Sequence, residues 1–496
     1  MRNNLLYQVK QIRALEKIAM EKYNISSDVL MQRAGQAAFR ELKNHWPQAK
    51  NITVVCGKGN NAGDGYVVAY LAKKHNLNVQ ILQLVPYTEL IGAARNAASE
   101  CQCLQIETSM FAPEKLRDSD VIIDALFGIG LIGAVRPQVR AAIVAINASN
   151  IPVLAIDIPS GIDAATGDIM GAAIHAQVTV TFLALKVGLF LGAARAYTGK
   201  VICDALQLAP KVFNQVQAVA QILDLLQELK SLPSRIPTAH KGDFGHLLVV
   251  GGDYGMGGAV QMAAVAAARV GAGLVSVATR PEHVTMLNVT CPEIMAHGIK
   301  TTKQLAQLCQ KVDIIVVGPG LGTGGWGKKL CRVVNLSKKR LVVDADALNI
   351  LATHRQMRDS WILTPHPGEA ARLLRTTIKN IQADRLTAVN NLQRQFGGIA
   401  ILKGAGTLVA TANDIRVCHA GNPGMASGGM GDVLSGIIGG LLAQGLNLFA
   451  AANLGVLVHA MAGDCLAAKE GEVGMLALDL LPEVRKILNF GGKRIS

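Results

Sequence analysis

Short apolar segments recur along almost the whole chain, each followed by a glycine-rich or acidic loop and then by a helical segment. Strands that alternate with helices in this way form parallel sheets covered by helices, because parallel strands need crossover connections. The sequence therefore predicts an α/β protein. The strand candidates are Ile52–Cys56, Val79–Leu84, Val121–Asp124, Val153–Ile156 and Val178–Phe182, then Leu247–Val250, Leu274–Ala278, Ile314–Val317, Leu341–Asp344 and Ile399–Leu402.

The alternation pauses once, between Gln207 and Lys230, and a loop-like stretch follows at 232–244. A chain of 496 residues is also long for one domain. We predict two domains, 1–215 and 225–496, with a boundary near residue 215 and no internal repeat. The opening, from Leu5 to Leu42, has helical spacing.

Composition narrows the class of protein. Half the residues are hydrophobic, only 4% are aromatic and the formal net charge is +14. The basic residues are scattered and are not interleaved with aromatic residues, which argues against a nucleic-acid groove. A positive field of this kind would still attract a small polyanion such as a dinucleotide.

The cysteines and the N-terminal segment indicate a cytoplasmic protein. The nine cysteines are dispersed, and the nearest pair, Cys101 and Cys103, is not a CxxC motif, so we expect reduced thiols. No signal peptide is evident in Met1–Arg13. The stretch Val433–Gly463 lacks Asp, Glu, Lys and Arg, but its glycines and polar residues predict two buried helices and no membrane span.

The loop Gly57–Gly65 follows a strand and precedes a helix, which is typical of phosphate binding by backbone N–H groups. Gly57, Gly59 and Ala62 formally satisfy G-x-G-x-x-G/A, although a simple tight turn has the same pattern. A dehydrogenase is disfavoured, because the next strand ends at Gln83–Pro86 without an acidic residue for a ribose.

Two further strand ends carry acids. Asp124 leads into a glycine-rich loop, and Asp157 leads into Pro159-Ser160-Gly161. Taken alone, either Asp could be only a cap or a turn former. Because the carboxyl ends of parallel strands meet at one edge of a sheet, we expect these loops to converge on one ligand.

The motifs GKGNNAGDG, DALFGIG…VRP, AIDIPSGID and TFLALKVGL, in this order, resemble the NAD(P)H-hydrate epimerase domain over roughly residues 1–210. The resemblance implies a Rossmann-like parallel α/β sandwich in which Asp157 contacts substrate as an acid/base with Lys186 nearby. It implies a potassium ion held by Asn61, Asp124 and Ser160. That family usually has Gly at the position of Ala62. The dinucleotide would contact Asn60, Asn61, Ala62, Gly63, Asp64, Gly128, Ile129, Gly130, Leu131, Ile132, Gly133 and Ala134.

The second half has five glycine-containing loops after strand candidates and no Walker A sequence, which excludes a P-loop site. In the last loop, backbone N–H groups at a helix start could cradle a phosphoryl group, and Asp432 could act as a general base. Asp432 could instead only cap the helix. His366 lies between two prolines in a glycine turn; it could be structural, but its loop position favours ligand contact. His459 is expected in the core. The loops are Gly251–Ala259, Gly318–Gly322, Thr364–Glu369, Lys403–Thr407 and Gly421–Asp432.

HKGDFGHLLVVGG, TPHPGE and GNPGMASGGMGDVLSG resemble the ADP/ATP-dependent NAD(P)H-hydrate dehydratase, a member of the ribokinase-like superfamily, over roughly residues 235–490. The resemblance implies a ribokinase-like α/β domain. Met430 departs from the usual Thr. The hydrated dinucleotide would contact Ala259, Gly322, His366 and Asp432, and the adenine nucleotide would contact Lys403, Gly404, Ala405, Gly406, Thr407 and Gly431.

Together the two resemblances imply a bifunctional enzyme that epimerises hydrated NADH and NADPH and dehydrates the S hydrate with ADP or ATP and Mg²⁺. Its partners would be these small molecules, with neither nucleic acid nor membrane. Two alternatives stay open: a small-molecule kinase with a regulatory dinucleotide-binding domain, and a binding or scaffold protein. The sequence leaves open ADP against ATP, NADH against NADPH, and a homo-oligomer.

Overall fold

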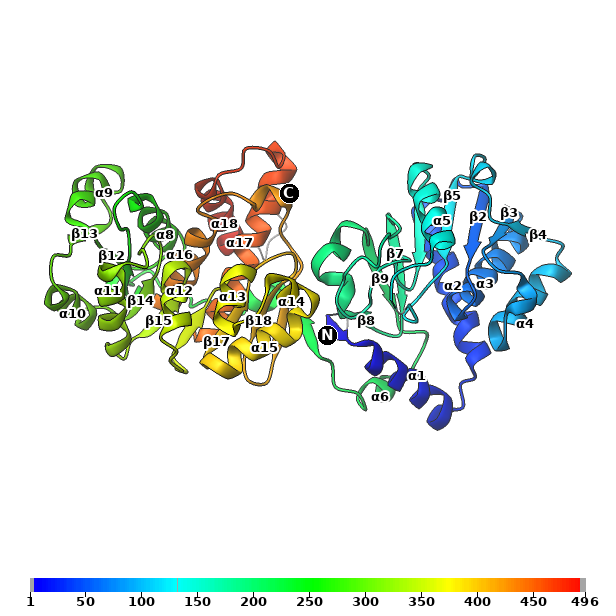
Figure 1. The fold of residues 1–496 in the computed structure, drawn as a ribbon, viewed down its shortest axis with the longest axis horizontal. Helices are drawn as coiled ribbons and strands as arrows, with labels where there is room; N and C mark the ends of the chain where they lie inside the picture. Colours follow the sequence, from blue (N-terminus) through cyan, green and yellow to red (C-terminus); the bar gives the residue numbers. More distant parts are fainter. Residues whose placement is uncertain (1–3, 132, 491–496) are drawn as a thin grey trace. The chain divides into compact units, whose positions relative to one another are not determined.

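The computed structural model describes residues 4–131 and 133–490, and it divides into two compact units, Met1–Gln221 and Ile222–Ser496. Each unit has its own main sheet and its own covering helices (Figure 1). The α/β class expected from the alternation of strands and helices is therefore confirmed for both halves of the chain.

The main sheet of the first unit is parallel throughout its described strands. Its order is β4-β3-β2-β5-β6-β7-β9. The order reverses between β2 and β5, and the carboxyl ends of strands at such a reversal are where open α/β sheets bind ligands. The strands are β2 (Asn51–Cys56), β3 (Asn78–Gln83), β4 (Glu107–Met110), β5 (Val121–Ala125), β6 (Val153–Ile156), β7 (Val178–Phe182) and β9 (Lys200–Asp204).

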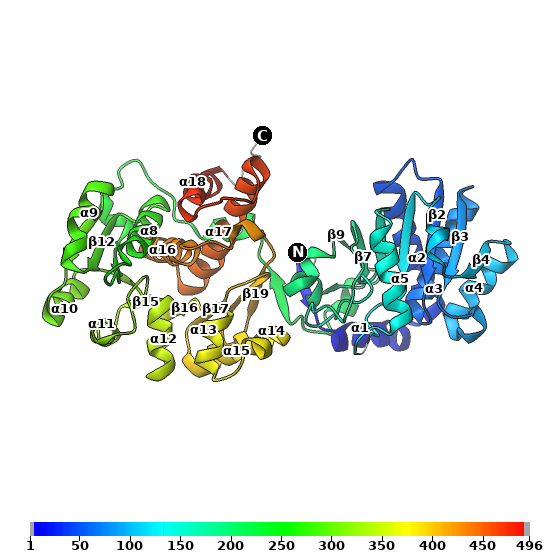
Figure 2. The same ribbon diagram turned by 45° about the horizontal axis from the view of Figure 1, so that its top comes forward.

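Helices cover both faces of this sheet. Val54 and Val55 are both buried but belong to different core clusters, because successive strand residues point to opposite faces. One cluster contains side chains of α1 (Val9–Tyr23), α2 (Ser27–His45), α3 (Asn60–Lys74) and α4 (Gly92–Cys103); the other contains those of α5 (Pro137–Ala148) (Figure 2).

The helical opening predicted from Leu5 to Leu42 is partly wrong. Leu5–Tyr7 forms a strand, β1, which pairs with β8 (Leu185–Lys186) and with β10 (Ala220–Ile222). The remaining segment is two helices, because Asn24 adopts a left-handed conformation (φ 51°) and Ser26 caps α2. Both β1 partners are distant in sequence, and helical spacing could not reveal them. The short helices α6 (Pro210–Phe213) and α7 (Leu225–Glu228) follow.

The sheet of the second unit runs β13-β12-β11-β14-β15-β16-β17-β18-β19 and reverses between β11 and β14. It is parallel up to β17, and β17, β18 and β19 pair antiparallel. Its strands are β11 (His246–Val250), β12 (Leu274–Thr279), β13 (Met295–Gly298), β14 (Ile314–Val317), β15 (Arg340–Val343), β16 (Trp361–Leu363), β17 (Ile399–Leu402), β18 (Thr407–Ala410) and β19 (Ile415–Cys418).

The helices of this unit also form two layers. A large core cluster joins one face of the sheet to α8, α16, α17 and α18. The helices are α8 (Gly257–Arg269), α9 (Val284–Thr290), α10 (Thr302–Gln310), α11 (Gly325–Leu336), α12 (Ala345–Thr353), α13 (Pro367–Leu374), α14 (Ile378–Ala383), α15 (Arg385–Phe396), α16 (Met430–Ala443), α17 (Leu448–Glu470) and α18 (Leu480–Phe490).

The long apolar stretch of the sequence forms α16 and α17, as predicted. Among the described helices only α17 is long and apolar enough to cross a membrane, and most of its apolar stretch is buried inside the unit. Small residues bring α16 close to α8: a Cβ added at Gly436 would lie 2.1 Å from the Ala263 carbonyl oxygen. The cysteines, all within the described ranges, are free thiols.

Candidate active sites

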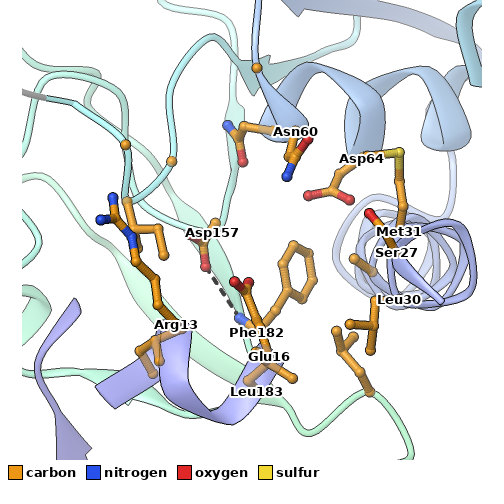
Figure 3. A pocket seen from close by; sticks show the side chains of 18 of the residues that line it. Arg13, Glu16, Ser27, Leu30, Met31, Asn60, Asp64, Asp157, Phe182 and Leu183 are labelled. Carbon is orange, nitrogen blue, oxygen red and sulfur yellow. Dashed lines mark hydrogen bonds between the residues drawn. The ribbon is translucent and has the colours of Figure 1, made fainter. Parts of the chain in front are cut away.

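A cavity of about 400 Å³ opens in the first unit at the reversal between β2 and β5. The start of α3 lies on one side of it, and the loop that follows β5 lies on another (Figure 3). Side chains of α1, α2 and the segment after β7 close the remaining walls. The strand ends therefore converge as the parallel arrangement predicted.

Asp157 and Lys186 form a buried ion pair in this cavity. Lys186 Nζ lies 2.5 Å from Asp157 Oδ1, and it also donates to Thr181 Oγ1 and to the Phe182 carbonyl oxygen. The Lys186 side chain is only 1% exposed, so little water competes with Asp157 for its ammonium group. Asp157 adopts φ 66°, a left-handed conformation that a non-glycine residue rarely takes and that is often found at functional sites.

Two further carboxyls face the same cavity (Figure 3). Burial raises the pKa of Asp64 well above its usual range, and the charges of Asp157 and Glu16 add to the shift. Burial also raises the pKa of Glu16. Burial therefore makes ionisation of both carboxyls less favourable than in water. Glu16 was not predicted. It lies in α1, before the first strand of the main sheet, and the sequence of that helix does not indicate that it packs over the cavity at the strand ends.

Asp124 and Ser160 are buried, do not line the cavity and are joined directly by hydrogen bonds. Ser160 donates to Asp124 through its hydroxyl, at 2.6 Å, and through its backbone N–H, at 2.7 Å. Burial raises the pKa of Asp124 to about 6, against these hydrogen bonds. The Asn61 amide is also buried, and neither its oxygen nor its nitrogen has a hydrogen-bond partner among the described residues. Asp124 bonds to Ser160 and Asp157 bonds to Lys186, so both acids do more than cap a helix or form a turn.

The glycine-rich loops bring only some of the predicted dinucleotide contacts to the cavity. Those that line it are Asn60, Asn61, Asp64, Gly128, Ile129 and Gly130. A Cβ added at Gly128 would lie 3.1 Å from Asp157 Oδ2 and 3.3 Å from Asn61 Oδ1, so the bare backbone keeps that approach open.

The other predicted contacts lie elsewhere. Ala62 and Gly63 are buried inside α3, and Ala62 has no positive φ, so its departure from Gly causes no strain. Leu131 packs on the core cluster beside α5. Gly133 and Ala134 are exposed beyond the cavity lining, and Ile132 lies outside the described residues. The roles assigned to these residues stay predictions.

The second unit gathers its loops at its own reversal, between β11 and β14. The Asp253 backbone N–H donates to the Gly320 carbonyl oxygen at 2.6 Å. The Gly322 N–H donates to Asp346 Oδ2 at 2.8 Å, which ties this loop to the start of α12. Ala259 adjoins the same place, since a Cβ added at Gly320 would lie 3.1 Å from the Ala259 Cβ. The predicted contacts Ala259 and Gly322 are therefore neighbours.

Lys403 and Asp344 form the centre of a second charged cluster. Lys403 Nζ lies 3.0 Å from Asp344 Oδ1, and Thr364 donates to the same oxygen at 2.7 Å. Burial alone would lower the pKa of Lys403, but the charges of Asp344 and Glu369 outweigh it and the pKa is raised. A Cβ added at Gly431 would lie 3.3 Å from Lys403 Nζ, which places this ammonium against the first turn of α16.

Asp432 lies in that first turn but does not cap the helix. The N-cap of α16 is Gly429, no side-chain cap is present, and the Asp432 carboxylate has no hydrogen bond among the described residues. Burial raises its pKa to about 7, and the charge of Asp344 adds to the rise while that of Lys403 opposes it. A carboxyl of this kind takes and releases protons near neutral pH, as a general base must.

His366 has a structural role that the sequence only partly indicated. Its Nδ1 accepts a hydrogen bond from the Gly368 N–H at 3.0 Å and caps α13, and Glu369 completes a capping box. Its Nε2 lies 3.4 Å from Glu369 Oε1, on a side chain that is 51% exposed. Burial lowers the pKa of His366, and Lys403 lowers it further, so the ring favours its neutral form. His459 is buried in α17, as expected.

Curated relatives match nearly the whole chain. The bifunctional NAD(P)H-hydrate repair enzyme Nnr of Coxiella burnetii is 48% identical over 98% of this chain and 99% of its own length. The Escherichia coli enzyme of the same name is 43% identical over 98% of this chain and 94% of its own length. Similarity of this extent covers both units and the region between them.

Each half also matches a family model. Residues 27–188 match the model described as YjeF-related protein N-terminus, and residues 247–486 match the one described as NAD(P)H-hydrate dehydratase. Among solved structures, the ADP/ATP-dependent NAD(P)H-hydrate dehydratase of Bacillus subtilis, co-crystallised with ATP and Mg²⁺, is 25% identical with a TM-score of 0.50. It covers 54% of this chain and 96% of its own length.

Proposed function

The chain belongs to the family of bifunctional NAD(P)H-hydrate repair enzymes, and we propose that its two units divide the two reactions between them. It is an epimerase and a nucleotide-dependent dehydratase for hydrated NAD(P)H. We assign epimerisation of the R and S hydrates to the first unit and dehydration of the S hydrate to the second. Both assignments rest on the charged groups that each unit collects at its own strand ends.

In the first unit, Asp157 is the proton acceptor. The hydrate carries its hydroxyl on a ring carbon bonded to nitrogen. If Asp157 takes the hydroxyl proton, the carbon–oxygen bond becomes a carbonyl, the carbon–nitrogen bond opens and the nitrogen takes a proton. Rotation and closure from the other face then invert the carbon and return both protons. Lys186 keeps Asp157 oriented, and Asp64, whose pKa is raised, is a suitable donor for the nitrogen.

We propose that a potassium ion binds among Asn61, Asp124 and Ser160. Asn61, Asp124 and Ser160 offer an unpartnered amide oxygen, a buried carboxylate and a hydroxyl, and hard cations prefer such oxygen ligands. When bound, the ion would supply positive charge opposite Asp124 and toward an anionic substrate. The free amide of Asn61 supports this proposal, because a buried polar group without a partner destabilises the fold unless a ligand satisfies it.

In the second unit, Asp432 takes the proton of the substrate hydroxyl. The hydroxyl oxygen then attacks the terminal phosphorus of ADP or ATP, and the bridging oxygen leaves with the nucleotide. Phosphate is a better leaving group than hydroxide, so loss of phosphate and of a neighbouring ring proton restores the dihydropyridine. We assign stabilisation of the transferring group to the backbone N–H groups at Gly431 and to the Lys403 ammonium; a Cβ added at Gly431 would lie 3.3 Å from Lys403 Nζ, which supports a shared role.

Mg²⁺ would enter with the nucleotide and neutralise its phosphates. Within the described residues, no cluster of three or more His, Cys, Asp or Glu side chains could hold a metal. The phosphates themselves would thus supply most of its ligands. We further infer a cytoplasmic enzyme whose partners are small molecules, an inference supported by its free thiols.

One observation carries the dehydratase assignment: Asp432 is half-buried in the first turn of α16, does not cap that helix, and lies close enough to Lys403 for the ammonium to lower its pKa. The test is an assay of purified protein with hydrated NADH, Mg²⁺ and either nucleotide, followed at the NADH absorbance band. We expect NADH to be restored with release of phosphate. A stable phosphorylated product without NADH would instead indicate a small-molecule kinase.

A further inference from the structure

Arg385, the first residue of α15, lies directly behind the loop Lys403–Thr407. Its side chain is buried, with 3% of its surface exposed. Its Nη2 donates to the carbonyl oxygens of Leu402, Lys403 and Gly406, each at 3.2 Å. Its Nη1 donates to Gln382 Oε1 at 2.8 Å. One guanidinium therefore gathers three carbonyl groups of a loop that spans only a few residues.

This arrangement fixes the direction of the loop's N–H groups. In a trans peptide the C=O and the following N–H point in opposite directions. The Lys403 carbonyl faces Arg385, so the N–H of Gly404 faces away from it. Gly404 and Ala405 are exposed, and their N–H groups have no acceptor among the described residues. The loop thus turns its acceptors inward and its donors outward, as backbone sites for anions do.

Glycine is required for this shape. Gly404 has φ 134° and Gly406 has φ 74°, and side chains rarely tolerate either conformation. A Cβ added at Gly404 would also lie 3.1 Å from Arg385 Nη1. The guanidinium and the bare loop backbone are therefore fitted to each other.

Arg385 also leaves its charge uncompensated. No carboxylate forms a salt bridge with it within the described ranges, although Asp384 is its neighbour and caps α15 instead. Burial lowers the pKa of Arg385 to about 10, so it stays charged at neutral pH. A buried cation without a counter-charge costs free energy that an anion bound on the other side of the loop would offset.

We propose that Arg385 is a positioning residue of the dehydratase, which holds the Lys403–Thr407 loop in the form that receives the phosphates of the adenine nucleotide. The proposal rests on the assignment of the nucleotide to this loop. Arg385 acts through the loop backbone, and its charge adds attraction for the polyanion.

The test compares Arg385→Met with Arg358→Met in the full chain. Arg358 is a matched control, because its guanidinium also donates to two backbone carbonyls, those of Asn335 and Lys339, and to the Ser360 hydroxyl. Titration calorimetry gives the Kd for ADP and ATP, and steady-state kinetics separate the KM for nucleotide from the KM for hydrated NADH. We expect Arg385→Met to raise nucleotide Kd and KM roughly tenfold or more and to leave the KM for hydrated NADH near that of the wild type.

Arg358→Met should leave nucleotide affinity unchanged even if its Tm falls as far. Equal nucleotide affinity in Arg385→Met and wild type would overturn the proposal, as would equal weakening in both variants. If Arg385→Met does not fold, Arg385→Lys decides: an ammonium keeps the charge but lacks the planar fork, so weaker nucleotide binding is expected and wild-type affinity contradicts the proposal.

Failure of the nucleotide assignment itself has a separate signature. Gly404→Val should abolish nucleotide binding if the loop is the site, since it places a branched side chain at φ 134°. If Gly404→Val binds ADP and ATP as the wild type does, the loop is not the nucleotide site, and the role of Arg385 falls with it. If only the Arg385 variants bind normally, the loop stands and the positioning role is wrong.

Discussion

Each unit collects charged residues at a reversal of its own strand order, where we propose that hydrated NAD(P)H binds, but the two sets of charged residues differ. In the first unit Asp157, the proposed acid/base, is paired with a buried lysine in the cavity that opens at the strand ends. In the second unit Asp432 has no partner of its own and shares a cluster with Asp344, Lys403 and Glu369, where burial raises its pKa to about 7. An ion pair holds a group in one geometry, whereas a carboxylate cluster tunes a group that must exchange a proton with substrate.

The largest expected effect that separates the units is that of Asp432→Asn. The amide is nearly isosteric but cannot take a proton, so dehydration should fall by roughly 10²–10⁴. Epimerisation should be unchanged, because Asp157 lies in the other unit. Coupled assays on each purified epimer measure both rates.

The same variant has a built-in check on folding. Because the raised pKa means that the ionised carboxylate is unfavourable in the fold, Asp432→Asn should unfold at the same or a higher temperature than wild type at pH 8. Near-native dehydration in a folded Asp432→Asn protein would show that Asp432 is not the base.

Lys186→Met should remove epimerisation and destabilise the first unit. The variant would leave Asp157 in a buried site without its ammonium partner, a change that typically costs about 3–5 kcal/mol. Chemical denaturation followed by fluorescence measures the loss. The control is Lys58→Met, since the Lys58–Glu89 bridge is exposed and its loss should cost less than about 1 kcal/mol. Similar losses in the two variants would contradict the buried-pair account.

The pH dependence of dehydration should follow Asp432. The base acts only when ionised, and its pKa is about 7. The kcat/KM for hydrated NADH reports the pKa of the free enzyme, so it should fall about tenfold per pH unit below that value and level off above it. The pKa of Asp432 is raised by the charges of Asp344, Asp346 and Glu369 and lowered by that of Lys403. Removing one acidic charge, as in Glu369→Gln, should therefore shift the midpoint downward. A flat profile between pH 5 and pH 8 would exclude Asp432 as the titrating group in this range.

Potassium should produce the smallest effect, confined to the first unit. If Asn61, Asp124 and Ser160 bind the ion, the unfolding temperature of that unit should rise by a few degrees in KCl relative to NaCl of equal strength. Asn61→Ala should abolish the difference between the salts. A difference that persists in Asn61→Ala would place the ion elsewhere.

The sequence indicated the site residues that lie at the ends of their own strands. Asp124, Asp157 and Asp432 were visible because each follows a strand or opens a helix, and parallel strands bring such ends together. Periodicity also revealed α16 and α17 as buried helices. These features can be predicted because they depend on local sequence pattern and on the general rule that parallel strands are connected with one handedness.

Contacts between distant segments were not visible. Glu16 comes from a helix before the first strand of the main sheet, and Lys403 meets Asp344 because of the strand order β15-β16-β17. In the sequence, Arg385 follows a helix cap and would be taken for an exposed charged residue. Only the structure shows that it donates to three carbonyl groups. The strand β1 pairs with segments far along the chain. Local spacing carries no information about such partners, and it therefore predicted a helix there.

The division of labour between the units is tested most directly by mixing two single variants. Asp157→Asn alone should restore NADH quickly from the S hydrate and then only at the uncatalysed epimerisation rate, and Asp432→Asn alone should restore almost none. An equimolar mixture, given both epimers with ADP or ATP and Mg²⁺, should restore all the NADH as the wild type does. If the mixture instead stops once the S hydrate is consumed, the two residues do not serve separate reactions and the account is wrong.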